Sequence, residues 1–287
     1  MDSLKFKISR LLLYFILVSV FLFVSGNVGR YFIEVQDMER KVAMLLQGTI
    51  FTGLTLIVLF ILKRKTPELF RLIGLKGVNS LSKMAIGIAL PFILLGVGIL
   101  TAYLFGGIEK ISMNLTKSVV ISILINTMTA FMYEAFPEEV FIRGLIFEEL
   151  QKMFRFFTSL FLQPLIFICV PITVMAMESI FFDRPFALTI DYFILLFAFG
   201  IALQLYRAYT GSLWMSIIFH IVYLEVVRYI SLGSKYEAGV ALIEFDETFE
   251  GFMSLYLSFL FIVIFSIVVL SVLILNDRRK IRHNRSL

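Results

Sequence analysis

The sequence predicts an all-α membrane protein, a polytopic bundle of about eight transmembrane helices with both termini in the cytoplasm. Composition is the first observation: 60% of the 287 residues are hydrophobic, 16% are charged, and mean hydropathy is +0.94. Soluble domains carry more charge and less apolar content. We therefore expect the lipid bilayer as a partner, and no nucleic acid.

The second observation is the number of apolar runs. A helix needs about 20 predominantly apolar residues to cross a bilayer. Runs of about this length lie at 11–28, 43–62, 85–106, 117–136, 164–182, 187–206, 211–230 and 252–275. The first run follows several cations and lacks a small-x-small cleavage site, which favours a retained helix over a cleaved signal peptide.

The third observation is the placement of charge. Lysine and arginine are concentrated in the loop after the second run and in the C-terminal tail, whereas the loop before the last run is acidic. Cations favour the cytoplasmic side, so both termini are expected there and the number of spans should be even. The loop between the first two spans carries mixed charges and would face outside. In the loop that follows the second span, residues 69–75 mix apolar residues with cations, as an interfacial helix does.

Neither a linker nor an internal repeat divides the chain. We expect one integral membrane domain over residues 1–287. Within it, 1–110 would hold the N-terminal spans and interfacial loop, 111–230 the core with the motifs, and 231–287 the outer acidic loop, last span and basic tail.

Two adjacent carboxylates and an arginine end the fourth apolar run, in Pro137-Glu138-Glu139-Val140-Phe141-Ile142-Arg143-Gly144. Pro137 suits a first helical turn, which predicts a helix from 137 to about 150. On it Glu139 and Arg143 stand at i and i+4 and can pair. Glu138 points elsewhere and lacks that arginine. Ionised groups at membrane depth need a partner, a wet cavity or a function.

Two further ionisable residues lie in apolar runs. His220 is in the middle of the seventh span, where it is either an interhelical hydrogen bonder or part of a polar cavity shared by spans four and seven. Glu178 lies in the fifth span, and its structural interpretation is a pair with Arg143, Arg207 or His220. Near predicted span ends, Arg207 and two other charged residues are interpreted as anchors, namely Asp191 and Arg228.

The depth of Glu178 depends on where the fifth span begins. A start near Pro164 places Glu178 somewhat past the membrane midplane, and the segment from Phe156 would then be interfacial or re-entrant. A start at Phe156 carries Glu178 to the far face, where it could not meet Glu138.

The chemistry of these residues suits water-mediated hydrolysis of an amide inside the membrane. A glutamate can act as base, an arginine can fix its neighbour, and a histidine can donate a hydrogen bond to developing negative charge. No serine nucleophile elbow, phosphate loop or HExxH zinc helix is present. The sequence predicts no cofactor and leaves a divalent metal open.

Glu138-Glu139-Val140-Phe141-Ile142-Arg143 resembles the first motif, EExxxR, of the CAAX prenyl protease and bacteriocin-processing (CPBP) membrane proteins, also called the Abi or type II CAAX endopeptidase family. Gly211 to His220 resembles the entry to the third motif, and the resemblance covers about residues 117 to 225. It implies that Glu138 activates water with help from a second-motif histidine. It also implies that Glu139 and Arg143 hold the site, and that His220 stabilises the oxyanion together with an asparagine or aspartate four residues later.

Two positions depart from the family pattern. The second motif, Phe-x-x-x-His, aligns with Val174-x-x-x-Glu178, and Leu224 stands four residues after His220. Loss of one oxyanion donor costs about 3 kcal/mol of transition-state stabilisation. A proton shared between Glu178 and Glu138 is one possible rescue. Glu225, turned inward by a helix irregularity, is another.

The leading functional hypothesis is an intramembrane endopeptidase of the CAAX/bacteriocin-processing type, in a prokaryotic plasma membrane, acting on a membrane-associated peptide or protein. The site residues would be Glu138, Glu139, Arg143, His220 and Glu178. The alternative is a catalytically impaired relative that serves as a membrane scaffold, partner or immunity protein. An ion or proton carrier is a third hypothesis, because three carboxylates lie in apolar runs.

Overall fold

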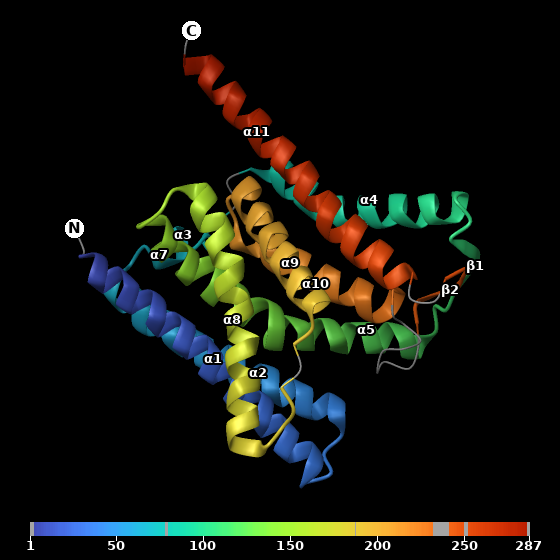
Figure 1. The fold of residues 1–287 in the computed structure, drawn as a ribbon, viewed down its shortest axis with the longest axis horizontal. Helices are drawn as coiled ribbons and strands as arrows, with labels where there is room; N and C mark the ends of the chain where they lie inside the picture. The colour runs from blue at the N-terminus through green and yellow to red at the C-terminus, as the bar shows by residue number, and fades with distance from the viewer. Residues whose placement is uncertain (1–2, 78–79, 187, 232–240, 250–251, 286–287) are drawn as a thin grey trace. The chain divides into compact units, whose positions relative to one another are not determined.

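The computed structural model describes residues 3–77, 80–186, 188–231, 241–249 and 252–285 (Figure 1). Within these ranges, eight helical segments are long and apolar enough to cross a membrane. They are Leu4–Glu34, Arg40–Lys65, Leu81–Leu104, Lys117–Gln151, Phe156–Phe182, Ile190–Thr210, Leu213–Ser231 and Leu255–Arg279. The predicted all-α, eight-span architecture is confirmed. The placement of both termini on the cytoplasmic side stays a prediction.

The chain forms two compact units. The first consists of Met1–Gly77 and Met128–Gln204, and the second of Val78–Thr127 and Leu205–Leu287. Two helices continue from one unit into the other: α5 (Lys117–Ala130) and α9 (Ile190–Thr210). The single-domain organisation over residues 1–287 stays a prediction.

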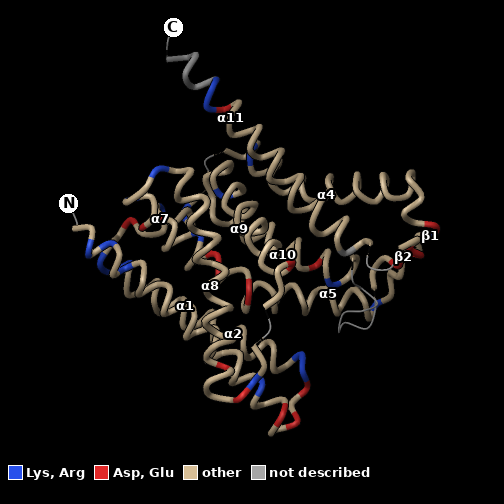
Figure 2. Tube along the Cα trace, in the orientation of Figure 1, with Lys and Arg blue, Asp and Glu red and all other residues tan. Residues whose placement is uncertain are grey.

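In the first unit, α1 (Leu4–Glu34) and α2 (Arg40–Lys65) pack along each other (Figure 1). Gly29 permits the approach, because a Cβ there would clash with the side chain of Gln47. α8 (Phe156–Phe182) also packs against α1. Most of the helical trace is uncharged, and both signs of charge gather where α1 turns into α2 (Figure 2).

The helix with the glutamate pair does not begin at Pro137, so that prediction was wrong. Residues 117–151 form one helical segment. Its parts are α5, the π-helical turn η1 (Phe131–Ala135), α6 (Phe136–Glu139), the π-helical η2 (Val140–Ile146) and α7 (Phe147–Gln151). We call the part from Phe131 to Gln151, which lies in the first unit, the motif helix.

The π turn explains how this helix accommodates a proline. The Phe136 N–H donates to the carbonyl of Phe131, five residues back. In that register the next donor would be the N–H that Pro137 lacks, and its acceptor would be the carbonyl of Met132. The hydroxyl of Thr52, in α2, donates to that carbonyl at 2.6 Å. A side chain from a neighbouring helix thus replaces the missing backbone donor, as membrane helices require.

The fifth span begins at Phe156, not near Pro164, and no separate interfacial segment precedes it. Pro164 and Pro171 both lie inside α8. Gly200 of α9 packs on Pro164, because a Cβ there would lie 2.9 Å from Cβ of the proline. Because a neighbouring helix accommodates the proline, α8 continues through it. A proline is therefore no reliable sign that a membrane helix begins.

The second unit contains α4 (Leu81–Leu104), most of α5, α10 (Leu213–Val226), the π-helical segments η3 (Val227–Ser231) and η4 (Ser254–Phe265), and α11 (Ser266–Arg285). A small antiparallel sheet, not expected from the sequence, pairs β1 (Ile108–Met113) with β2 (Ile243–Glu247). Residues 232–240 of the expected acidic loop lie outside the described residues. The predicted interfacial helix at 69–75, in the first unit, is reduced to α3 (Leu69–Leu72).

The contact between α2 and the motif helix generates a stability prediction. A Cβ at Gly48 would lie 2.8 Å from Cβ of Met132, whereas a Cβ at Gly53, on the same helix, would meet nothing within 4 Å. Gly48→Ala should destabilise the protein by about 1–3 kcal/mol through overpacking. Gly53→Ala, the matched control, should be neutral or slightly stabilising. Equal midpoints in denaturant titrations of the two detergent-solubilised variants would contradict this packing.

Candidate active site

A fully buried ion pair lies inside the motif helix. Nη1 of Arg143 is 3.1 Å from Oε1 of Glu139, and both side chains are 0% exposed. The Arg143 guanidinium also stands over the Phe167 ring of α8, 4.2 Å from its centre. Desolvation of two charges is costly unless each is paired, and stacking on an aromatic ring adds to the compensation. The i, i+4 pairing is as the sequence indicated.

Glu138 has a different environment from its neighbour. Its side chain is half-buried. Among the residues that the structure describes, it makes no hydrogen bond or ion pair. One carboxylate of the pair is therefore fixed by an arginine, and the other is not.

Glu178 is held by arginines at the end of α8. Its Oε1 lies 3.3 Å from Nη2 of Arg30, in α1, and 3.5 Å from Nη1 of Arg184, just after α8. Nη1 of Arg184 also donates to Oδ1 of Asn27 at 2.8 Å. Within the first unit, Arg143, one of the partners suggested by the sequence, pairs with Glu139 instead. Because α8 begins at Phe156, it carries Glu178 close to its C-terminal end. The position that aligns with the second-motif histidine thus belongs to a cluster of ionic contacts.

A pocket of about 570 Å³ adjoins this cluster in the first unit. Its lining combines apolar side chains, among them Val174 and Met175, with Arg30, Glu178 and Tyr133. Tyr133 comes from the motif helix, five residues before Glu138. It lies within electrostatic reach of both Glu138 and Glu178. The tyrosine therefore connects the wall of this pocket to the motif helix that carries Glu138.

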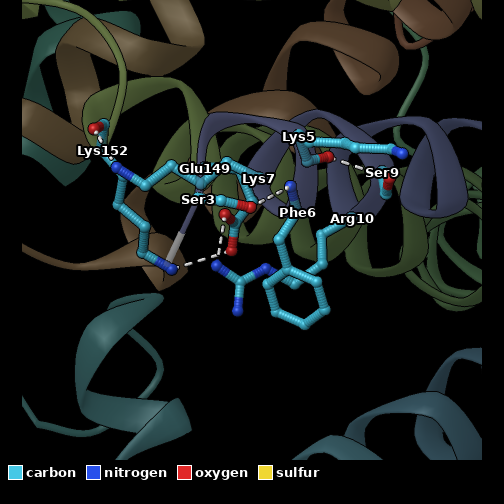
Figure 3. A network of polar contacts seen from close by, with 8 residues as sticks. All are labelled: Ser3, Lys5, Phe6, Lys7, Ser9, Arg10, Glu149 and Lys152. Atoms are coloured by element: carbon cyan, nitrogen blue, oxygen red, sulfur yellow. Dashed lines mark hydrogen bonds and ion pairs between the residues drawn. The ribbon is translucent and has the colours of Figure 1, made fainter. Parts of the chain in front are cut away.

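A second ionic network fixes the far end of the motif helix (Figure 3). Glu149 is 3% exposed. Its Oε2 lies 3.1 Å from Nη2 of Arg10, and its Oε1 lies 2.8 Å from Nζ of Lys152. Nζ of Lys7 donates to the backbone carbonyl of Lys152 at 2.9 Å. These contacts join the N-terminal part of α1 to α7.

His220 belongs to the second unit, where its side chain in α10 is 3% exposed. Leu224, one turn later, is half-buried. The next residue, Glu225, accepts a hydrogen bond of 2.6 Å from Nδ2 of Asn126 in α5. Oδ1 of Asn126 in turn accepts from Nη1 of Arg228 at 3.2 Å. An amide and a carboxylate thus stand beside the third-motif region, although position 224 itself is apolar.

Two arginines interpreted from sequence as anchors are in fact buried. Arg207 and Arg228 are each 7% exposed, and Arg228 is held by Asn126. Asp191 is exposed, as an anchor would be.

A metal site is not formed by the described side chains. No group of three or more His, Cys, Asp or Glu residues among them is arranged to hold a metal ion. In the first unit, the two neighbouring carboxylates differ in environment: Glu139 is paired with Arg143, and Glu138 is half-buried.

The fold and these residues define a multi-pass membrane protein with paired glutamates and an internal ion pair in its fourth span. Residues 120–224 match the family described as type II CAAX prenyl endopeptidase Rce1-like. This match supports the family resemblance drawn from the motifs, over the segment that carries them. Comparison with curated proteins found no match.

Several residues around the site were not anticipated. Arg30 was assigned to a loop, but α1 extends to Glu34 and includes Arg30 near its C-terminal end. Arg184 follows α8 directly. Tyr133 and Asn126 lie on the same helical segment as Glu138, and polar residues in an otherwise apolar run were the available signal. Their partners come from distant segments, which a single sequence does not reveal.

The buried pair generates the prediction of this section. Arg143→Met should destabilise the protein by about 3–5 kcal/mol, because it leaves the Glu139 carboxylate buried and uncompensated. The double variant Glu139→Leu/Arg143→Met should recover most of this loss, because both charges are then absent. Free energies of unfolding in detergent, measured for the wild type, the single variant and the double variant, would test both expectations.

The exposed pair of Arg71 and Glu68 offers a matched control, since their side chains are 68% and 60% exposed. Arg71→Met should cost no more than about 1 kcal/mol. A loss at Arg143 as small as that at Arg71, or no recovery in the double variant, would show that the pair does not stabilise the motif helix.

Proposed function

We propose that the protein is an intramembrane endopeptidase in a prokaryotic plasma membrane, and that Glu138 is its general base. The observation that supports this most directly is the contrast between neighbouring glutamates. Glu139 is neutralised by Arg143 at 0% exposure, whereas Glu138 is half-buried and makes no hydrogen bond within the described residues. A carboxylate that is not held by another side chain, in a setting of low dielectric constant, can accept a proton from water.

In the proposed reaction, Glu138 removes a proton from a water as the water oxygen attacks the scissile carbonyl carbon. The carbonyl becomes an oxyanion, whose stabilisation by preorganised donors is a major catalytic term. The protonated Glu138 then delivers its proton to the departing amine as the C–N bond breaks. The family resemblance assigns the oxyanion donor role to His220, and this assignment remains a prediction.

Glu138→Gln should abolish proteolysis while the protein remains folded, because the amide cannot accept the proton of the attacking water. Loss of a general base reduces rates by about 10²–10⁴-fold. Glu148→Gln, on the same helix, is the matched control and should retain activity. Mass spectrometry of peptide termini in membranes of cells expressing each form would measure this. Unchanged new termini with Glu138→Gln would contradict the proposed role.

A second function is favoured by the contacts of Glu178. Where the family has a histidine, this chain has a carboxylate paired with Arg30 and Arg184, and Leu224 replaces an oxyanion donor. A catalytically impaired relative that holds a peptide or an envelope protein would tolerate both changes. The pocket beside Glu178, with apolar walls and charged groups, is suited to binding such a segment.

The scaffold hypothesis predicts a partner that co-purifies after mild solubilisation, equally with the wild type and with Glu138→Gln. It also predicts identical peptide termini in the two strains. Retention of the partner without new termini would favour the scaffold. New termini that depend on Glu138 would favour the protease.

A further inference from the structure

A second pocket, of about 540 Å³, lies in the first unit where α2 ends. We call it the basic pocket, and its lining consists of Lys63, Pro67, Glu68, Phe70, Arg71 and Lys76. We propose that the basic pocket binds the headgroup of an anionic phospholipid, in the leaflet on the side of the N-terminus. This inference holds for either of the functions proposed above.

Three separate segments bring cations to the basic pocket. Lys63 lies in the last turn of α2, and its Nζ is 4.9 Å from the centre of the Phe70 ring. Arg71 lies in α3. Lys76 follows a tight turn after α3, and its position is fixed by its backbone.

The turn that positions Lys76 is well defined. The N–H groups of Leu75 and Lys76 both donate to the carbonyl of Phe70, at 2.8 and 2.9 Å. Gly74 has φ +82°, a left-handed conformation that glycine adopts at little cost. Below the turn, Leu69 and Ile73 are buried at 7% and 1% exposure, which anchors it to the bundle. The cations therefore converge through packing and hydrogen bonds, not through free side chains alone.

The lining carries a positive excess. Glu68 is its one carboxylate, and Glu68 forms an ion pair with Arg71. Lys63 and Lys76 have no carboxylate partner among the described residues. Two lysines thus remain for an anion, and basic clusters next to the cytoplasmic end of a span attract anionic lipid headgroups.

The surroundings favour a lipid over a soluble anion or an acidic peptide. Phe60 and Ile61, directly before the pocket on α2, are 57% and 50% exposed. Leu72 of α3 is 45% exposed. The basic pocket therefore lies where an apolar helix surface gives way to cations, at the depth of headgroups. A phospholipid can place its phosphate among the lysines and its acyl chains along the exposed apolar side chains.

Native mass spectrometry of the full-length protein in detergent tests the proposal. The probes are phosphatidylglycerol and phosphatidylcholine with the same acyl chains. The wild type should retain phosphatidylglycerol preferentially, and less so as salt is raised. Lys63→Gln/Lys76→Gln should weaken this binding by at least about tenfold, since each cation near an anionic surface contributes about a fivefold factor.

The matched control is Lys5→Gln/Lys65→Gln, which removes the same charge from exposed positions on the same side of the first unit that do not line the basic pocket. It should keep the preference for phosphatidylglycerol. Equal weakening of phosphatidylglycerol binding in both double variants would show that the positive charge of this side attracts the lipid without a defined site, and would overturn the proposed site. Equal retention of phosphatidylcholine by the wild type would overturn the preference for an anionic lipid. Displacement by glycerol phosphate or an acidic peptide at the same concentration as the lipid would overturn the lipid assignment. The salt dependence of the wild type tests the proposal even where a variant unfolds.

Discussion

The cost of placing charge at membrane depth is the constraint on which the motif helix depends. Glu139 and Arg143 are both 0% exposed, and neither could be ionised there alone without a penalty of several kcal/mol. Their mutual contact and the Phe167 ring reduce that penalty. Because Arg143 forms its ion pair with Glu139, it does not neutralise Glu138 through a direct contact. The burial of one pair thereby leaves a second carboxylate available beside it.

Similar compensation holds the rest of the first unit around this helix. Pro137 has no N–H, so the carbonyl of Met132 lacks its backbone donor. The hydroxyl of Thr52 donates to this carbonyl instead. Glu149, at the other end, is held by Arg10 and Lys152. Each contact satisfies a polar group that lipid could not. The motif helix is thus tied to α2 and α1 by the same groups that make its irregular backbone tolerable.

The sequence predicted the fold well because hydropathy and span length are local properties. All eight spans were found, and so was the i, i+4 pair. Helix boundaries were less accurate where proline was used as a start signal, at Pro137 and Pro164, because neighbouring helices accommodate both residues. The small sheet was missed, since β1 and β2 are separated by more than a hundred residues and lie between apolar runs. Partners such as Arg30 for Glu178 require a contact between distant segments, which one sequence does not encode visibly.

The replacement at the second-motif position is best understood together with its neighbours. A glutamate introduced near Glu138 would add negative charge to the site and oppose ionisation of the base. Here α8 runs from Phe156, so that Glu178 lies at its end, between Arg30 and Arg184. Its charge is compensated locally by these two arginines. The glutamate at position 178 is thus compatible with a functional Glu138, because Arg30 and Arg184 compensate its charge without help from Glu138. If Glu138 is the base, as proposed, this replacement removes the histidine that the family resemblance places beside it, and catalysis would then depend more heavily on Glu138 itself.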